Sequence, residues 1–399
     1  MSEVFLNDIC HLIVDCPHST ANDEGAGYPL VRTPNIGRGR LIYSGMHRVC
    51  EDVYNKRNAR AVPQANDLIF AREATAGNVA LIQEGEKVCL GQRTVLIRPD
   101  ASKVNPAFLT YYLLAPEQQY KLLSTANGAT VAHVNMPTIR NLKLNLPPLS
   151  TQHRIATILS RYDSLIENYQ KQIKLLEEAA QRLYKEWFID LRFPKHENTN
   201  IVDGVPEGWE KKKVGEIAKV NANTISKTYP HSTIEYVDLG SVREGRIFEK
   251  TTYQVGEEPG RAKRIAKDGD VIWGVVRPNL KSFALVMNPN ETEVYSTGFA
   301  VLSALLVPFT FLYCSVTTDS FVGYLVNCTN GAAYPAVKAE HFINAEIIVP
   351  TNVLLDEFGR VTIPMYRKIE KISTQLRLLT EARDRLLPKL MSGEMEVQV

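Results

Sequence analysis

The 399-residue sequence lacks several features that would assign a function at once. It has no run of about 18 or more apolar residues, and its start, Met1–Ile9, has no basic segment leading into an apolar one. We therefore expect neither a membrane span nor a secretion signal. The six cysteines are scattered and form no Cys-x-x-Cys pair. That pattern favours a reduced, cytoplasmic chain with buried thiols over a zinc or disulfide framework.

Excess charge of one sign is also missing. The formal net charge is only +2, whereas many nucleic-acid-binding domains are strongly basic. With 44% hydrophobic and 23% charged residues, the composition is that of a soluble globular protein, and the length allows two or three domains. Composition leaves DNA binding open without favouring it.

The common catalytic motifs are absent as well. We find no Walker-type phosphate loop, no Gly-x-Ser-x-Gly elbow, no His-Glu-x-x-His helix and no Cys/His cluster that would predict a metal site. The string nearest to the Asn/Asp-Pro-Pro-aromatic loop of an amino-methyltransferase, Asn145–Pro148, has the wrong spacing. The histidines are isolated, so His133 and His153 are interpreted as structural or surface groups. A binding or organising role is favoured over catalysis.

What the sequence does contain is an internal repeat. Asn127 and Gly128 recur as Asn330 and Gly331, an offset of 330 − 127 = 203. The same offset relates Pro147 to Pro350, Glu167 to Glu370, Gln172 to Gln375, and Arg182-Leu183 to Arg385-Leu386. Two copies of one unit are the simplest explanation.

Upstream the match weakens and the offset drifts. Gly39–Ile42 still resembles Gly245–Phe248, and Asp67–Phe70 resembles Asp270–Trp273. The two halves therefore share a scaffold and differ in their loops, as expected for two copies of one binding fold with different targets.

Each half is predicted to be mixed and mostly β, followed by a long helix, which makes the fold class α+β. Short apolar runs bounded by turn residues predict strands at Asp67–Ala71, Val79–Gln83, Thr94–Arg98, Val271–Val276 and Ala300–Leu306. Helical patterns follow at Pro106–Leu114, Pro116–Ser124, Phe309–Thr317 and Asp319–Asn327, and each half closes with an extended segment, Leu142–Pro147 or Ala345–Pro350.

A heptad pattern then predicts the long helix of each half, capped in the first by Ser150 or Thr151. We call the a and d positions of the heptads the seam of the helix. The first seam is Ile155, Leu159, Tyr162, Ile166, Tyr169, Ile173, Leu176, Ala180, Leu183 and Trp187. The second is Phe358, Thr362, Met365, Ile369, Ile372, Leu376, Leu379, Arg383, Leu386 and Leu390.

Two features of the second seam need an explanation. Thr362 and Arg383 are polar and could fix the register, and Pro364 requires a kink or a later helix start. Each helix could simply pack on its own domain. Pairing of the two helices is favoured, and it should be antiparallel because a whole domain lies between them.

These elements predict five segments. They are a first recognition domain at 1–149, a central helix at 150–192, a linker at 193–204, a second recognition domain at 205–350 and a C-terminal helix at 351–399.

Nearly the whole chain resembles one known family. Asn127–Thr130 and Asn145–Ile155 resemble the end of a target-recognition domain running into its helix, as in the specificity subunits of Type I restriction-modification systems. Tyr28–Gly39 resembles that family's opening β segment, and Val205–Glu210 resembles the start of its second domain. These are scaffold motifs, so they carry no information on the target sequence.

The resemblance implies a division of labour. Each domain would read one half of a bipartite, asymmetric site in double-stranded DNA, and the paired helices would serve as a spacer that docks modification subunits, two being expected. Those subunits would bind S-adenosylmethionine and methylate adenine, and a motor-nuclease subunit would be a further partner for cleavage. This chain would need no cofactor and no metal, and would be non-catalytic.

Base reading needs Arg, Lys, Asn, Gln or Thr side chains on loops. The candidates are Arg38, Arg40, Lys56, Arg57, Arg72, Thr75, Gln92 and Arg93 in the first domain, and Arg243, Arg246, Arg261, Lys263, Arg264, Arg277, Asn279, Lys281 and Tyr334 in the second. Arg40 and Arg246 recur in both halves, which favours phosphate or scaffold contacts for them.

Partner contacts are predicted at Tyr184, Trp187, Phe188, Leu387, Leu390 and Met391. A coiled-coil scaffold with two ligand-binding or protein-binding domains is the alternative function, and an enzyme with an unfamiliar active site is a third.

Overall fold

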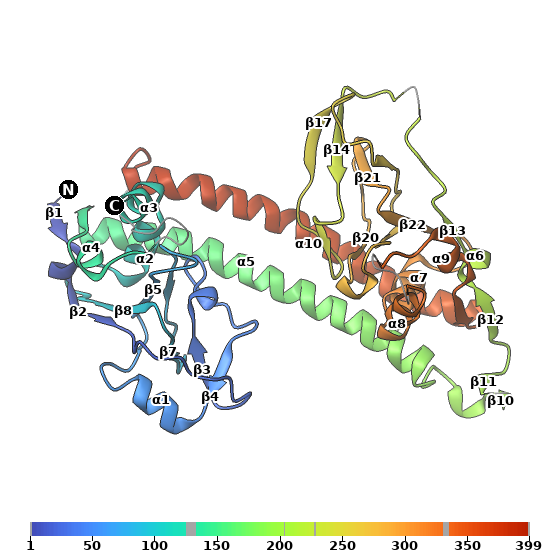
Figure 1. Cartoon of the computed structure of the whole chain (residues 1–399), viewed down its shortest axis with the longest axis horizontal. Helices are drawn as coiled ribbons and strands as arrows, with labels where there is room; N and C mark the ends of the chain where they lie inside the picture. Colours follow the sequence, from blue (N-terminus) through green and yellow to red (C-terminus); the bar gives the residue numbers. More distant parts are fainter. Residues whose placement is uncertain (1, 125–132, 203, 227–228, 330–334, 398–399) are drawn as a thin grey trace. The chain divides into compact units, whose positions relative to one another are not determined.

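The computed structural model describes residues 2–124, 133–202, 204–226, 229–329 and 335–397 (Figure 1). The chain divides into two compact units. Unit 1 comprises Met1–Asn168 with Leu376–Val399, and unit 2 comprises Tyr169–Gln375. Each unit therefore holds one globular half together with one end of each long helix.

Unit 1 is built on a four-stranded antiparallel sheet of order β2 (Cys10–Asp15), β8 (Thr94–Pro99), β5 (Leu68–Ala71) and β6 (Val79–Leu81). A second sheet has the order β4 (His47–Val49), β3 (Tyr28–Val31) and β7 (Cys89–Leu90), with β3 and β7 parallel. A ribbon joins β1 (Ser2–Phe5) to β9 (Lys143–Leu146). The short helices are η1 (Leu6–Ile9), η2 (Thr33–Asn35), α1 (Glu51–Arg57), α2 (Pro106–Leu114), α3 (Pro116–Leu123) and α4 (Met136–Arg140).

Unit 2 repeats this plan. Its antiparallel sheet has the order β13 (Ala218–Val220), β22 (Phe299–Ala304), β19 (Val271–Gly274) and β20 (Phe283–Leu285). Its second sheet has the order β17 (Thr251–Gln254), β14 (Thr233–Val237), β21 (Glu293–Ser296) and β18 (Ala262–Arg264), with β14 and β21 parallel. Three two-stranded ribbons pair β12 (Glu210–Lys213) with β23 (Glu346–Val349), β15 (Val242–Arg243) with β16 (Arg246–Ile247), and β10 (Ile201–Val202) with β11 (Val205–Pro206). The short helices are the π-helical turn η3 (Lys185–Ile189), η4 (His196–Asn198), α6 (Val214–Ile217), η5 (Pro278–Leu280), α7 (Phe309–Val316), α8 (Asp319–Asn327) and α9 (Ala339–Asn344).

The apolar runs form strands because both of their faces are buried. Along β5, Leu68 and Phe70 face the core that contains α2, whereas Ile69 faces the core shared with the second sheet. In β19, Trp273 and Ile272 divide between two cores in the same way. A strand buried on both faces reads as a continuous apolar run and not as an alternating one.

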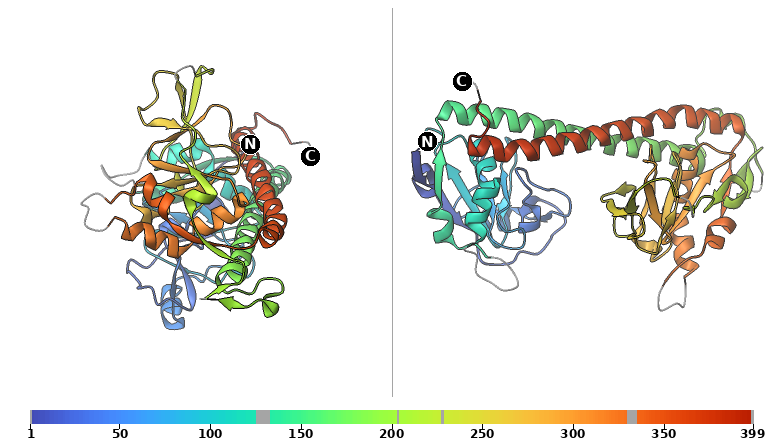
Figure 2. Two further views of the ribbon diagram at one scale, coloured as in Figure 1. Left: turned by 90° about the vertical axis from the view of Figure 1, so that its right-hand side faces the viewer. Right: turned by 90° about the horizontal axis from the view of Figure 1, so that it is seen from above.

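The long helices are α5 (Leu149–Tyr184) and α10 (Asn352–Ser392). Within each unit they lie side by side (Figures 1 and 2). Unit 1 holds the start of α5 with the end of α10, and unit 2 the end of α5 with the start of α10, so the pairing is antiparallel, as predicted. Every predicted seam position is buried or half-buried, which confirms the α+β fold class with paired helices.

Two details of the helix ends differ from expectation. Helix α5 begins at Leu149, so Ser150 and Thr151 lie inside its first turn, and the predicted cap is wrong. Helix α10 begins at Asn352 and continues through Pro364, so of the two alternatives for that proline, a kink or a later start, the later start is wrong. The packing of the surrounding helix outweighs the one backbone hydrogen bond that a proline removes.

The cysteines allow a test of the core. Cys16, Cys89 and Cys314 are buried and Cys50 is exposed. Burial raises the pKa of Cys89 to about 11 and that of Cys314 to about 12, which suppresses the reactive thiolate. We expect timed alkylation with mass spectrometry to label Cys50 first, and Cys314 only after unfolding. Rapid labelling of Cys314 in the native protein would contradict this packing, and a Cys50→Ser variant supplies the control.

Candidate nucleic-acid interface

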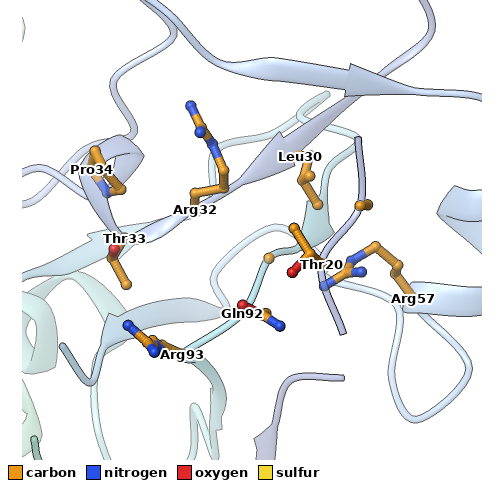
Figure 3. Close-up of a pocket in the computed structure, with 10 residues that line it drawn as sticks. Thr20, Leu30, Arg32, Thr33, Pro34, Arg57, Gln92 and Arg93 are labelled. Carbon is orange, nitrogen blue, oxygen red and sulfur yellow. The ribbon is translucent and has the colours of Figure 1, made fainter. Parts of the chain in front are cut away.

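A pocket of about 230 Å³ lies in unit 1 between α1, the end of β3 and the turn that joins β7 to β8 (Figure 3). Its walls combine basic, hydroxyl and amide side chains with a few small or apolar ones. The lining residues are Thr20, Ala21, Leu30, Arg32, Thr33, Pro34, Arg57, Gly91, Gln92 and Arg93. The pocket therefore collects three arginines and no carboxylate.

Arg57 forms one wall from the last turn of α1. It is only 6% exposed. Its Nε donates to the carbonyl oxygen of Leu90 at 2.6 Å, and its Nη2 donates to the carbonyl oxygen of Ser19 at 2.9 Å. In Figure 3 the guanidinium points toward Thr20. Among the described residues, no carboxylate forms an ion pair with it.

The turn after β7 presents Gln92 and Arg93. A Cβ on Gly91 would lie 2.6 Å from the carbonyl oxygen of Val31, so glycine is what lets this turn pack against β3. Arg93 has a left-handed backbone (φ 63°), a conformation that is unfavourable for a side-chain-bearing residue. Its guanidinium is 60% exposed and pairs with Glu73 at 2.6 Å. An exposed arginine on a strained turn is well placed for an interaction outside the domain.

Four of the five other predicted residues of the first domain have partners within the protein. Arg72 is buried and binds Asp15 at 2.6 Å. Arg40 binds Glu167 of α5 at 2.8 Å, which makes it a link between the domain and its helix. The remaining three are Arg38, which donates to the carbonyl oxygen of Leu114, Thr75, which donates to that of Thr33, and Lys56, which is exposed.

In the second domain the predicted residues lie at three places. Arg243 and Arg246 flank the tight turn between β15 and β16, and Arg246 approaches Glu177 of α5 at 3.7 Å. Arg261, Lys263 and Arg264 lie in or beside β18, the first two exposed and the third half-buried. Asn279 lies in η5, and Arg277 and Lys281 flank it with left-handed backbones; Lys281 pairs with Asp319 at 2.7 Å. Tyr334 lies outside the described residues.

The clearest difference between the two halves lies at one edge of the parallel strand pair. In unit 1, α1 packs along β7 through Arg57, whereas in unit 2 the strand β18 pairs with β21. The parallel pair β3–β7 of unit 1 corresponds to the parallel pair β14–β21 of unit 2. Matching their registers aligns Val31 with Val237 and Leu90 with Tyr295. By the same alignment, Gln92-Arg93 corresponds to Thr297-Gly298. Scaffold strands are retained, and the residues at this edge are exchanged.

The predicted partner-contact residues pack inward. Tyr184, Trp187 and Phe188 join the core of unit 2, and Leu390 is buried in unit 1 with Leu387 and Met391 beside it. Their role in partner binding stays a prediction, as do the individual DNA contacts.

Sequence reasoning missed Thr20, Arg32 and Thr33 in the pocket, and Asp163 on α5. Asp163 has a nearly buried carboxylate that pairs with Arg383 at 2.9 Å and accepts a hydrogen bond from Tyr111 at 2.6 Å. Arg383 as a polar seam residue was the available signal, but its partner is 220 positions away. Thr362, by contrast, bonds Thr310 of α7 and not the other long helix.

Within the described ranges, no helix is long and apolar enough to cross a membrane. In the same ranges, no group of His, Cys, Asp and Glu side chains could hold a metal ion. The fold defines a protein with two similar globular halves and two long helices. The family model that matches residues 1–178 is the Type I restriction modification DNA specificity domain.

The relatives extend this match over the chain. The Type I restriction enzyme MjaIX specificity subunit of Methanocaldococcus jannaschii is 26% identical over 387 residues, 94% of this chain and 88% of the relative. The HindI specificity subunit of Haemophilus influenzae is 21% identical, over 75% of this chain and 80% of its own length. The crystal structure of a Type I S subunit from M. genitalium shares the fold, with a TM-score of 0.64 and 16% identity over 98% of this chain and 95% of that one. The chain is thus similar to Type I specificity subunits over most of its length, and its first 178 residues match their family model, which confirms the resemblance.

Proposed function

We propose that this chain is the DNA sequence-recognition subunit of a Type I restriction-modification complex and reads a bipartite, asymmetric site. The observation that carries the proposal is the duplicated scaffold with an exchanged edge, α1 in one half and β18 in the other. Two copies of one scaffold give two reading surfaces, and different side chains at the same edge give two different half-sequences.

The remaining parts of the complex follow from this role. The partners are double-stranded DNA and modification subunits, two per chain, with a motor-nuclease subunit as a further partner. S-adenosylmethionine binds in the modification subunit, and this chain holds no cofactor of its own. The five segments given above correspond to two recognition domains, two spacer helices and a linker, and the complex acts in the cytoplasm.

Reconstitution tests the proposal. We expect the purified chain alone to transfer no methyl group to DNA, and its complex with the modification subunit to methylate adenine at a specific sequence. Incorporation of labelled methyl groups from S-adenosylmethionine into DNA measures both. Methylation by the chain alone, or sequence-independent methylation by the complex, would contradict the proposal.

Replacing Arg93 tests the first reading surface. Arg93→Gly removes the guanidinium and relaxes the left-handed backbone, so the variant should fold at least as well as the parent. A lost base contact of about 1–3 kcal/mol should reduce discrimination at one base pair of one half-site by roughly 5- to 150-fold. Binding to duplexes with every single-base change measures this, with the other half-site as the internal control. Equal discrimination by variant and parent would remove Arg93 from the reading surface.

A further inference from the structure

The pocket beside α1 carries charged side chains of one sign only. Three arginines line it, and no lining residue is acidic. Its volume, about 230 Å³, is below the roughly 300–1,000 Å³ of pockets that enclose drug-sized ligands. The space suits a small anionic group better than a nucleobase with its sugar.

Arg57 is the decisive side chain. A guanidinium has five N–H donors, and the bonds from Nε to Leu90 and from Nη2 to Ser19 use two of them. Both acceptors are backbone carbonyls, which carry partial charge only. A buried charge without a counterion is unfavourable, and an anion in the pocket would offset that cost.

The neighbouring charges reinforce this. Arg93 already pairs with Glu73, so its positive charge is partly balanced. Arg32 donates from Nη2 to the carbonyl oxygen of Gly45 at 3.0 Å, and its Nε is buried without a hydrogen-bond partner among the described residues. Arg32 and Arg57 are therefore the two arginines of the pocket that form no ion pair within the described part of the chain.

The second half does not repeat the arrangement. Asp238 occupies the position of Arg32, because Val237 aligns with Val31, and this aspartate accepts hydrogen bonds from Ser241. In unit 2 the strand β18 pairs with β21, whereas in unit 1 Arg57 of α1 bonds to Leu90 of β7. Across the described residues of unit 2, the combination of an arginine following the parallel strand and a buried arginine on a helix does not recur.

We propose that this pocket is an anion site that holds one backbone phosphate of bound DNA, and that it anchors the first recognition domain alone. Arg57 donates to the phosphate oxygens, the Thr20 hydroxyl adds a neutral donor, and Arg32, whose guanidinium points away from Thr20 and Arg57 in Figure 3, adds positive charge at the rim of the pocket. The assignment rests on the proposed function and adds to it a contact that fixes position without reading sequence.

Salt dependence of binding is the first test. Each phosphate contact contributes about 0.9 to the slope of log affinity against log salt concentration. In complex with the modification subunit, Arg57→Met should reduce the magnitude of that slope by about one. It should also weaken binding to all duplexes equally. Lys143→Ala, which removes a charge from β9 outside the pocket, should leave the slope unchanged. An unchanged slope in Arg57→Met, or a changed base preference at one position, would overturn the phosphate assignment.

A neutral-backbone scan locates the contact. Duplexes with a single methylphosphonate should bind the parent complex less well at one position of one half-site, and Arg57→Met should be insensitive at that same position. Arg32→Gln repeats the measurement if Arg57→Met folds poorly, since Arg57 also holds the Leu90 and Ser19 carbonyls. Equal sensitivity of parent and variant at every position would contradict the proposal.

An experiment without DNA distinguishes failure of the anion site from failure of the proposed function. Inorganic phosphate should raise the unfolding temperature of the full parent chain more than that of Arg57→Met. If the parent complex recognised no DNA sequence, the proposed function would fail, yet a phosphate effect lost in the variant would still support an anion site. No difference between the two chains in phosphate would refute the site itself.

Discussion

Arg383→Ala should lower the free energy of unfolding by about 3–5 kcal/mol, because it leaves a buried carboxylate without its counterion. The Asp163 side chain is only 5% exposed, and its partners are Arg383 at 2.9 Å and the Tyr111 hydroxyl at 2.6 Å. Asp163→Ala should cost less, because Arg383 keeps its bonds to the exposed Asp384. Chemical denaturation followed by circular dichroism measures both. A loss below about 1 kcal/mol for Arg383→Ala, typical of an exposed pair, would contradict this reading.

The repeat supplies a matched control for the same site. The positions that correspond to Tyr111, Asp163 and Arg383 at an offset of 203 are Cys314, Tyr366 and Ala180, all three buried in the core of unit 2. The triple variant Tyr111→Cys, Asp163→Tyr and Arg383→Ala installs that apolar set in unit 1. We expect it to recover most of the stability lost in Arg383→Ala, since a buried ion pair can be replaced by well-packed apolar groups. A triple variant less stable than Arg383→Ala would show that the two sites are not equivalent.

Phe358→Ala should also cost about 3–5 kcal/mol, because it removes the centre of an aromatic cluster. Phe358 is fully buried, and its ring centroid lies 5.1 Å from that of Phe188 and 6.1 Å from that of Trp187. The cluster joins the start of α10 to η3, the turn that follows α5, so near-ultraviolet circular dichroism should weaken along with stability. Val353→Ala, on the same helix but 70% exposed, is the control and should change stability by less than about 0.5 kcal/mol. Equal stabilities for the two variants would contradict the packing.

The parts of the fold that could be predicted from the sequence are those that produce a regular residue pattern. The heptad seams from Ile155 and from Phe358 predict helices because their period reports burial on one face. The offset of 203 shows the duplication without any knowledge of the strands. The boundaries were less accurate: the cap at Ser150 or Thr151 was wrong, because helix starts depend on packing as well as on capping residues.

The candidate site was harder to predict because the surroundings of a loop side chain are set by distant segments. Lys56 and Arg57 are adjacent in sequence, yet Lys56 is exposed and Arg57 is buried against Leu90. Arg72 was a candidate base reader and is buried beside Asp15. The exchange of α1 for β18 was visible only as a drift in the offset, since the two segments share no residue pattern.

Mapping methylated adenines across the genome of a host that carries this chain and its modification partner tests the central claim most directly. The account predicts one two-part site whose halves differ in sequence and are separated by unspecified bases. It also predicts that Arg93→Gly alters one half and leaves the other intact. A palindromic site, a continuous site, or a methylation pattern that does not change when this chain is removed would contradict it.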